Sequence, residues 1–203
     1  MQEIEKKFLI ELNGKALGNG KILNAKTITD RLCELGIRPS CYLITQLYLR
    51  PFESTGKNIE TRLRIQTPKR NGKLFPNEAT ITACSKTSVR QGGILNRTEE
   101  ERQITQGEYD SAAESAEKKL VKLRIQADKA ISFDIIQKDG KDIVLCEVEF
   151  PTEAMATMFT SSNLADWLCG FGTSKRSFDF VVTDVTRDPS YRSWTLAEWI
   201  EPK

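Results

Sequence analysis

Pairs of like charges separated by one residue recur along this chain, together with a few single charges on the same pattern. Paired carboxylates supply the oxygen ligands that Mg²⁺ binds, while arginine and lysine side chains hold phosphate oxygens. A site that combines both kinds would bind a polyanion together with a divalent metal, and a triphosphate would satisfy it. The acids are Glu3, Glu5, Glu99, Glu101, Asp134, Glu147 and Glu149, and the cations are Lys7, Arg62, Arg64, Lys86, Arg97, Lys122 and Arg124.

The chain has no histidine, which removes Ser-His and Cys-His nucleophile pairs and every imidazole metal ligand. Its cysteines are odd in number, widely spaced and never in a C-x-x-C pair, which argues against a disulfide framework or a zinc site. Any metal is therefore expected to bind oxygen, and this preference indicates Mg²⁺ or Mn²⁺. The cysteines are Cys33, Cys41, Cys84, Cys146 and Cys169.

The net charge of +2 is the small difference between 30 basic and 28 acidic residues, so no overall field favours nucleic acid or an anionic membrane. No apolar run approaches the roughly 20 residues that span a bilayer, and Met1 leads straight into charged residues. We therefore expect a soluble cytoplasmic protein whose partner is a small-molecule triphosphate, without membrane or nucleic-acid binding. A homodimer stays open.

The elements that must position these charges are mostly strands. With 203 residues, 39% of them apolar, and no linker or repeat, the chain is expected to form a single domain over 1–203. Alternation of apolar and polar residues predicts eight strands. Their ranges are 2–10, 43–50, 59–66, 79–87, 95–105, 119–126, 130–138 and 142–150.

Helical patterns fall between and after these strands, at 27–36, 107–118, 152–168 and 195–200. Thr27 or Thr29 could cap the first helix, and Gly36 could end it. The stretches 51–58, 68–78 and 88–94 carry Pro, Gly, Asn and Lys and are typical of loops. Residues 170–182 give no clear pattern.

Successive side chains on a strand point to opposite faces, so each strand divides into two sets. Arg62 and Arg64 oppose Leu63 and Ile65, and three other strands show the same pattern, whereas Glu100 and Arg102 make the face opposite Glu99 and Glu101 only weakly apolar. A single such strand is usually half exposed, with its charged face in solvent. Because eight strands repeat the pattern and helices are present to cover the apolar faces, we predict an α+β fold: a closed eight-stranded antiparallel β-barrel with charged faces inside and helices outside.

These residues, in this order, resemble the CYTH superfamily, the triphosphate tunnel metalloenzymes. The opening Glu3-Ile-Glu5-Lys-Lys7 is similar to its E-x-E-x-K motif, and six further motif elements follow in register to about residue 160. Within the family the chain looks most like the small bacterial inorganic triphosphatases. Cys84 and Ser85 before Lys86, and the extra segment 170–182, depart from the family pattern. The later elements are Arg62-x-Arg64, Lys86, Arg97-x-Glu99-x-Glu101, Lys122-x-Arg124, Asp134, Glu147-x-Glu149 and a C-terminal piece at 184–191.

The resemblance implies an eight-stranded tunnel, Mg²⁺ or Mn²⁺ dependence, and hydrolysis of inorganic, thiamine or nucleoside triphosphate. It assigns all seven acids to metal and water positioning, not all as direct ligands, and all seven cations to the phosphates. Lys86, Tyr48, Glu147 and Glu149 are the catalytic candidates. Tyr48 would contact Lys86 or the attacking water, and a core or lid role is the alternative.

Three other functions stay open. A class IV adenylyl cyclase would make cyclic AMP and pyrophosphate from ATP in a similar tunnel. A non-catalytic module would bind triphosphate or polyphosphate, although so many carboxylates disfavour an anion sensor. An RNA 5′-triphosphatase would need a broad basic patch, which the sequence does not indicate.

Overall fold

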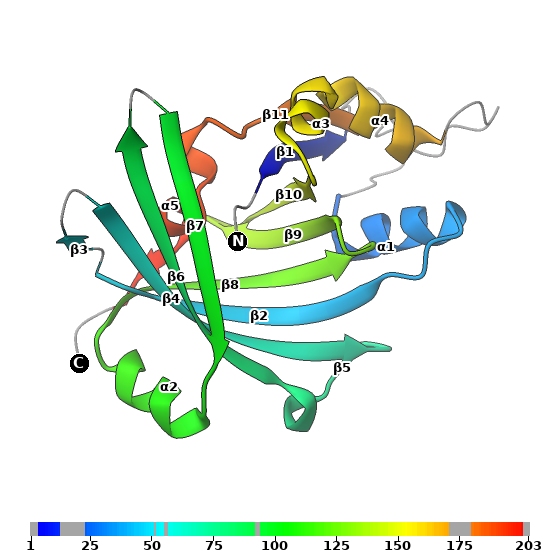
Figure 1. Ribbon diagram of the computed structural model, residues 1–203. Coiled ribbons are helices and arrows are strands. Elements are labelled where there is room, and N and C mark those ends of the chain that lie inside the picture. Colours follow the sequence, from blue (N-terminus) through cyan, green and yellow to red (C-terminus); the bar gives the residue numbers. More distant parts are fainter. Residues whose placement is uncertain are drawn as a thin grey trace. The chain divides into compact units, whose positions relative to one another are not determined.

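The computed structural model describes residues 4–12, 23–50, 52–54, 57–91, 94–170 and 180–200, with the side chains of 52–54, 57–58, 88–91 and 94–97 left out. Glu3 and the side chain of Arg97 therefore lie outside the described part of the chain. The protein has an α+β fold dominated by antiparallel strands (Figure 1). No helix in the described ranges is long and apolar enough to cross a membrane.

Twelve strands lie within the described residues, and all eight predicted strands are among them. The strands are β1 (Glu5–Leu12), β2 (Ser40–Leu49), β3 (Phe52–Ser54), β4 (Lys57–Arg70), β5 (Lys73–Leu74), β6 (Thr80–Gln91), β7 (Ile94–Gln103), β8 (Ala116–Gln126), β9 (Ile131–Lys138), β10 (Lys141–Glu149), β11 (Phe180–Asp184) and β12 (Glu198–Trp199). The α-helices are α1 (Ala25–Glu34), α2 (Gln106–Ala113), α3 (Glu153–Met158), α4 (Ser161–Cys169) and α5 (Ser193–Leu196), with 3₁₀ turns η2 (Pro76–Glu78) and η3 (Pro189–Tyr191).

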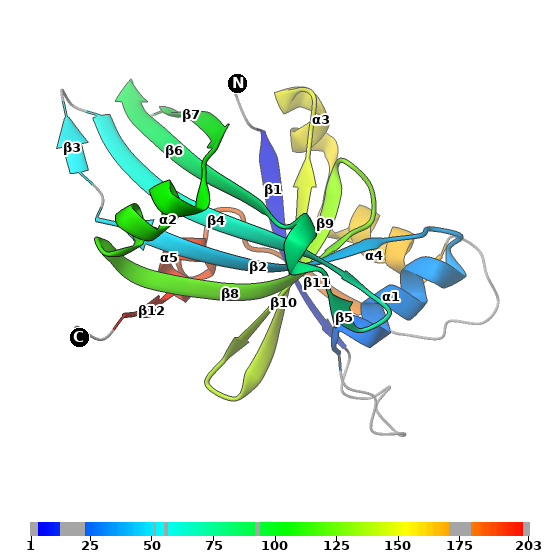
Figure 2. The same ribbon diagram turned by 90° about the horizontal axis from the view of Figure 1, so that it is seen from below.

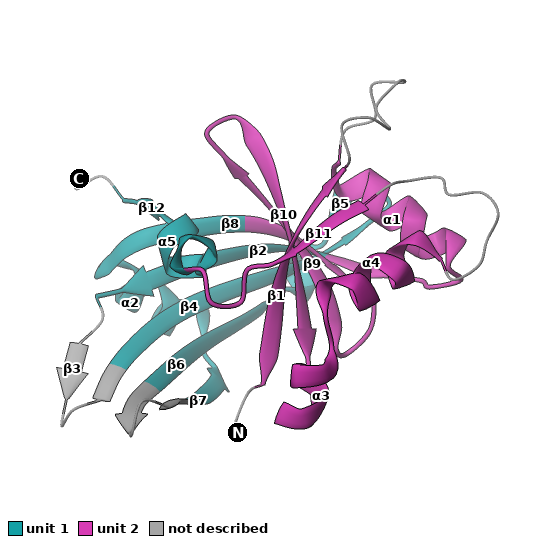
Figure 3. Cartoon of the chain, turned by 90° about the horizontal axis from the view of Figure 1, so that it is seen from above, with its two compact units in different colours: residues 1–3, 42–121, 189–203 teal, residues 4–41, 122–188 magenta. Residues whose placement is uncertain are grey.

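The chain divides into two compact units, coloured separately in Figure 3. Unit 1 comprises Met1–Glu3, Tyr42–Val121 and Pro189–Lys203, and unit 2 comprises Ile4–Cys41 and Lys122–Asp188. Strand β8 passes from the first to the second. The single domain and the closure of the sheet into a barrel stay predictions.

In unit 2 the strand order is β11-β1-β10-β9-β8. One face of these strands is apolar and packs under helices α1 and α4, through side chains such as Ile28, Leu32, Leu164 and Leu168. Asn24 begins α1, because its side chain accepts a hydrogen bond from Thr27 N at 3.0 Å. The predicted caps Thr27 and Thr29 therefore lie inside that helix. The Trp167 ring stacks on Phe133 with a centroid separation of 6.4 Å.

In unit 1 the strand order is β8-β2-β4-β6-β7, and β12 pairs with β8. Leu47, Leu63 and Tyr109 form the centre of an apolar cluster on one face, where α2 packs (Figure 2). Thr105 and Glu108 close a capping box at the start of α2. Near the C-terminus, Lys118 Nζ lies 4.8 Å from the Trp194 ring and 4.5 Å from the Trp199 ring.

Several predicted boundaries were wrong for identifiable reasons. The helix expected over 152–168 is two helices, because Asn163 Oδ1 accepts from both Thr160 N and Thr160 Oγ1 at 2.8 Å and begins a new helix there. The helix expected over 107–118 ends at Ala113, where the alternating β8 pattern takes over. The helix expected over 195–200 is α5 followed by β12, which pairs with β8.

The loops predicted between strands are shorter than expected. Strand β4 extends to Arg70 and turns back into β5 through Asn71 and Gly72, with φ of 50° and 78°. Positive φ at both central residues is the type I′ hairpin geometry, which Asn-Gly favours. Strands β6 and β7 likewise extend into the stretch 88–94 that was expected to be a loop, and β11 begins at Phe180, near the end of the stretch 170–182 that gave no clear pattern.

Candidate functional site

Cross-strand pairing places the charged residues of unit 2 on the face opposite its apolar core. In the register of β1 and β10, Lys7 lies opposite Glu147 and Glu5 opposite Glu149. In the register of β8 and β9, Arg124 lies opposite Asp134. Directly opposed residues share a face of the sheet. The charged face of unit 2 is therefore Glu5, Lys7, Lys122, Arg124, Asp134, Glu147 and Glu149.

Asp134 is the most buried acid of this face, with a side chain only 2% exposed. Lys122 Nζ donates to its Oδ2 at 2.5 Å, and Arg124 donates to both oxygens at 2.7 Å. Lys122 is itself only 4% exposed. Both Asp134 oxygens are thus engaged by cations, which makes the carboxylate a fixed support for two positive charges.

Glu147 joins the same network from β10. Its Oε1 lies 3.0 Å from Lys7 Nζ, and its Oε2 accepts from Arg124 Nη2 at 2.5 Å. Arg124 therefore bridges Asp134 and Glu147. Its planar guanidinium has the fork geometry that such a bridge requires.

Burial and pairing oppose each other in setting the pKa values here. Burial raises the pKa of a carboxylic acid, because it favours the neutral form. Arg124 and Lys122 nevertheless hold the pKa of Asp134 below its usual value. Likewise, Lys7, Lys122 and Arg124 hold the pKa of Glu147 well below its usual value. Burial and the neighbouring Arg124 charge lower the pKa of Lys122 to about 8. Burial also lowers the pKa of Lys7, but Glu147 and Glu5 outweigh it and raise the value.

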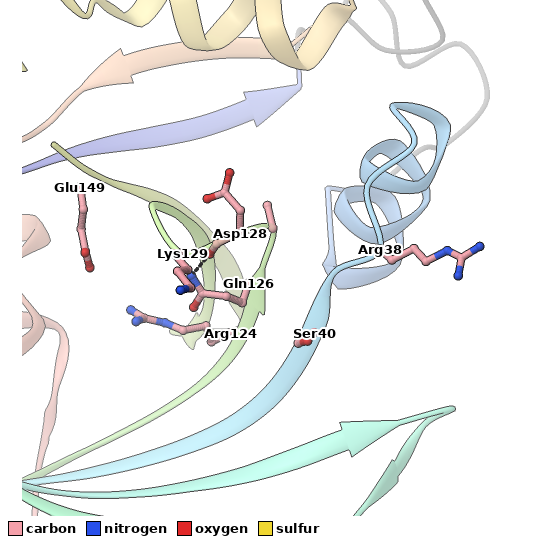
Figure 4. Close-up of a pocket in the computed structure, with 8 residues that line it drawn as sticks. Arg38, Ser40, Arg124, Gln126, Asp128, Lys129 and Glu149 are labelled. Atoms are coloured by element: carbon pink, nitrogen blue, oxygen red, sulfur yellow. Dashed lines mark hydrogen bonds between the residues drawn. The ribbon is translucent and has the colours of Figure 1, made fainter. Parts of the chain in front are cut away.

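A cavity of about 440 Å³ adjoins this network in unit 2 (Figure 4). Its lining is polar apart from Ala127 and includes Arg124, Gln126 and Lys129 from β8 and the following turn, with Glu149 from β10. The Arg38 side chain points away from Arg124 and Lys129 in this view. A pocket of this size is large enough for a small ligand.

Unit 1 carries a second charged face, built on β4, β6 and β7. Arg62 lies opposite Cys84, which lies opposite Glu101, and Glu60 lies opposite Lys86, which lies opposite Glu99. Leu63 and Ile65, on the alternate positions, pack in the apolar cluster with α2. The charged face of unit 1 therefore contains Glu60, Arg62, Arg64, Cys84, Lys86, Glu99 and Glu101.

Glu99 lies at the centre of this face. Its Oε1 accepts from Arg62 Nη2 at 2.9 Å and from the Cys84 thiol at 2.8 Å, and its Oε2 lies 2.8 Å from Lys86 Nζ. Glu101 is more exposed and reaches Arg64 Nη1 over 3.4 Å. Burial raises the pKa of the Cys84 thiol to about 12, so the sulfur is protonated at neutral pH.

Tyr48 is fully buried on β2, where Leu47 packs in the apolar cluster and Gln46 and Tyr48 lie on the other face of the strand. Its hydroxyl donates to Gln46 Oε1 at 3.0 Å, and its ring meets Trp194 edge-on at 5.7 Å. Gln46 Nε2 is buried without a hydrogen-bond partner among the described residues. A buried amide donor in this state is costly unless a ligand completes it.

The structure thus brings Lys7, Lys122, Arg124, Asp134 and Glu147 into one network and Arg62, Lys86 and Glu99 into another. Glu5 and Glu149 are paired across strands at the end of the first face, and the predicted roles of all these residues stay predictions. Sequence reasoning left out three polar residues of the unit 1 site. Alternation from Arg62 would have found Glu60, and Cys84 shares the parity of Lys86, but nothing in the sequence signalled the buried amide of Gln46.

No family model matches the chain, and no curated protein matches it either. Solved structures that match include the inorganic triphosphatase NE1496, with 20% identity, 97% of this chain and 95% of that chain covered, and a TM-score of 0.44. A putative adenylate cyclase from Bacillus halodurans matches with 14% identity, 82% and 89% coverage and a TM-score of 0.45. The putative adenylyl cyclase HpAC1 from Hippeastrum, described as having a dominant triphosphatase activity, matches with 13% identity, 82% and 86% coverage and a TM-score of 0.42. These values carry no argument about chemistry, which rests on the residues above.

Proposed function

We propose that this protein hydrolyses a triphosphate in the presence of Mg²⁺ or Mn²⁺. The observation that carries the proposal is the charged face of unit 2, where Lys122, only 4% exposed, and Arg124, 16% exposed, surround the buried Asp134. Burying such charges is costly, and an apolar replacement would often be as stable. A face of this kind is therefore best explained as a binding site for a highly charged ligand.

Cations on both faces would hold the phosphate oxygens. Lys7, Lys122 and Arg124 are fixed by carboxylates in unit 2, so they need little rearrangement when an anion binds. In unit 1 we assign the same role to Arg62, Arg64, Lys86 and Arg97. We further propose that the sheet closes into a barrel, so that one triphosphate contacts both faces.

The donor set fits a hard divalent ion. Glu5 and Glu149 are cross-strand partners, and Glu147 lies on the same face two residues from Glu149. These three residues would hold Mg²⁺ or Mn²⁺, whose oxygen preference they match. When bound, the ion would neutralise phosphate charge and help to orient a water molecule. Asp134 would act through Lys122 and Arg124, because its side chain is only 2% exposed, whereas that of Glu147 is 15% exposed.

Phosphoryl transfer depends mainly on positioning and charge stabilisation, so this chain needs no covalent nucleophile. Lys86 would stabilise charge on the transferring or leaving phosphate, and the buried donor of Gln46 could complete a phosphate contact. Glu147 and Glu149 would orient the attacking water. Tyr48 would support Gln46 through the hydrogen bond that it donates.

The experiment is phosphate release from tripolyphosphate, thiamine triphosphate and ATP with Mg²⁺ or Mn²⁺, with products resolved by chromatography. Glu147→Gln and Glu5→Gln should abolish turnover, while Glu117→Gln, which alters an acid paired with Arg50 instead, should not. Cyclic AMP with pyrophosphate as the products of ATP would establish a cyclase. Failure to turn over any triphosphate with either metal would overturn the proposal and favour a binding module.

A second measurement addresses whether one substrate contacts both faces. Arg64→Ala in unit 1 and Lys7→Ala in unit 2 should each raise KM for the triphosphate that is hydrolysed. If only the unit 2 variant did so, substrate binding would belong to unit 2 alone and the proposed closure would lose its support.

A further inference from the structure

The charged face of unit 1 contains a group of ligand atoms that the proposed hydrolysis does not use together. Cys84 Sγ and one carboxylate oxygen from each of Glu99 and Glu101 all lie within 4.8 Å of one another. The pairing of β6 and β7 produces this group, because Cys84 lies directly opposite Glu101 and Glu99 is two positions away on the same face. Cys84 is only 1% exposed.

We propose that Cys84, Glu99 and Glu101 form a second metal site, distinct in ligand chemistry from the all-oxygen site of unit 2, for a thiophilic divalent ion of the zinc class. A thiolate combined with carboxylates suits Zn²⁺, Co²⁺ or Cd²⁺, whereas Mg²⁺ prefers oxygen alone. The sequence did not indicate this site, because the cysteines are widely spaced and only the pairing of β6 with β7 brings Cys84 next to the two glutamates.

The geometry requires little movement. In a tetrahedral zinc site a sulfur and an oxygen ligand lie about 3.6 Å apart, as follows from metal–ligand distances of about 2.3 and 2.1 Å. Cys84 Sγ and Glu99 Oε1 are now 2.8 Å apart and joined by the thiol proton. An ion that replaces this proton would push the two atoms apart by less than about 1 Å, within the reach of a side-chain rotation.

The neighbouring cations do not block replacement of the thiol proton by a metal ion. Glu99 Oε1 accepts from both Arg62 and Cys84, so loss of the thiol donor leaves the arginine contact intact, and Lys86 lies on the other oxygen. Metal coordination removes the thiol proton outright. The site would therefore gain one net positive charge when the ion binds, and Glu60 and Glu101 on the same face would offset it.

Cobalt provides the direct test, because Co²⁺ substitutes for zinc and a bound thiolate gives it a charge-transfer band in the near ultraviolet. Titration of the full chain should develop this band to saturation at one ion per chain, and added Zn²⁺ should remove it. Cys84→Ser should abolish the band. Cys146→Ser should keep it, because that cysteine is buried in the apolar core of unit 2.

Glu101→Gln provides a second variant if Cys84→Ser fails to fold, since Glu101 is exposed and its replacement leaves the thiol in place. It should weaken cobalt binding by about tenfold or more, because loss of even an outer-shell partner of a metal ligand typically costs about 10–100-fold in affinity. Absence of the band in the unaltered protein, or a band that survives Cys84→Ser, would overturn the proposed site.

A functional consequence rests on the proposed hydrolysis. An ion on Glu99 changes the charge beside Arg62 and Lys86, so Zn²⁺ should inhibit Mg²⁺-dependent phosphate release, and Cys84→Ser should be inhibited at least tenfold less strongly. Inhibition equal in both proteins would count against the link between this site and turnover. If no triphosphate were hydrolysed, the proposed function would fail, while the cobalt band would still decide the metal site.

Discussion

In unit 2, Asp134 and Glu147 have all four carboxylate oxygens engaged by cations, within a network whose side chains are 16% exposed or less. In unit 1, Glu101 is 37% exposed at its side chain and reaches Arg64 only at 3.4 Å. The Arg64–Glu101 pair is therefore held more loosely than the unit 2 network, whereas Glu99 in unit 1 lies 2.9 Å from Arg62 and 2.8 Å from Lys86 and is held tightly. A rigid face binds an anion without reorganisation, whereas loose pairs can exchange partners when a ligand or metal arrives.

The largest effect should come from breaking the rigid network. Asp134→Asn would leave Lys122 and Arg124 buried beside a neutral amide, and removal of one partner from a buried ion pair typically costs about 3–5 kcal/mol. Urea unfolding should show a loss of this size. Glu101→Gln is the matched control at the loose Arg64–Glu101 pair, and an equal loss in both variants would contradict the distinction between this pair and the unit 2 network.

Lys86→Ala tests the chemistry of the unit 1 face. Loss of one preorganised charge contact should lower kcat for the triphosphate by about 10²–10³, while stability changes less than in Asp134→Asn, because Glu99 keeps its contacts with Arg62 and Cys84. Steady-state kinetics together with thermal unfolding separates the two effects. A variant that lost stability in proportion to its activity would show that Lys86 is mainly structural.

Acid should weaken the network of unit 2. The pKa values of Asp134 and Glu147 are lowered in the folded protein, so the unfolded chain binds more protons in acid. Their stabilisation is complete above the unfolded values, about 4, and is lost as pH falls towards the lower folded values. Metal-free unfolding measured from pH 7 to pH 3 should show this loss, with a shallower dependence in Asp134→Asn. If stability depended on pH in the same way in both proteins, a contribution of Asp134 to the loss in acid would be excluded.

The smallest effect on stability should come from the ion pair between Arg64 and Glu101, whose closest charged atoms are 3.4 Å apart. Arg64→Lys, which keeps the charge but removes the guanidinium, should change the free energy of unfolding by less than about 1 kcal/mol, as for most partly exposed ion pairs. Arg124→Lys should cost clearly more, because Arg124 bridges two carboxylates. Similar values for these two substitutions, measured by urea unfolding, would remove the contrast.

Alternation along the sequence predicted the strands well, because most have an apolar face that packs in a core and a charged face that does not, although β7 is charged on both faces at Glu99 to Arg102. Arg62 and Arg64 against Leu63 and Ile65 is the clearest case. The pattern could not show which carboxylate meets which cation, since that depends on register between strands far apart in the chain. Lys7 and Glu147, 140 positions apart by their numbers, illustrate the point.

Other features depend on which of two competing local interactions forms, such as a helix cap or a continued helix, and composition does not show this. The break between α3 and α4 comes from one side chain, Asn163, that accepts the Thr160 donors. The C-terminal residues around Glu198 have a helical pattern but pair with β8, because tertiary pairing outweighs a weak helix propensity. The proposed role of Cys84 as a metal ligand follows only from its cross-strand neighbour Glu101, which the sequence does not reveal.

The placement of the tryptophans gives each unit its own fluorophore. Trp167 stacks on Phe133 in unit 2, whereas Trp194 and Trp199 lie beside the Lys118 ammonium in unit 1. A Trp167→Phe protein would therefore emit from unit 1 alone, and a protein with both Trp194 and Trp199 replaced by Phe would emit from unit 2 alone. Coincident unfolding curves from the two proteins would mean that the units melt together, and separate curves would give each unit a stability of its own.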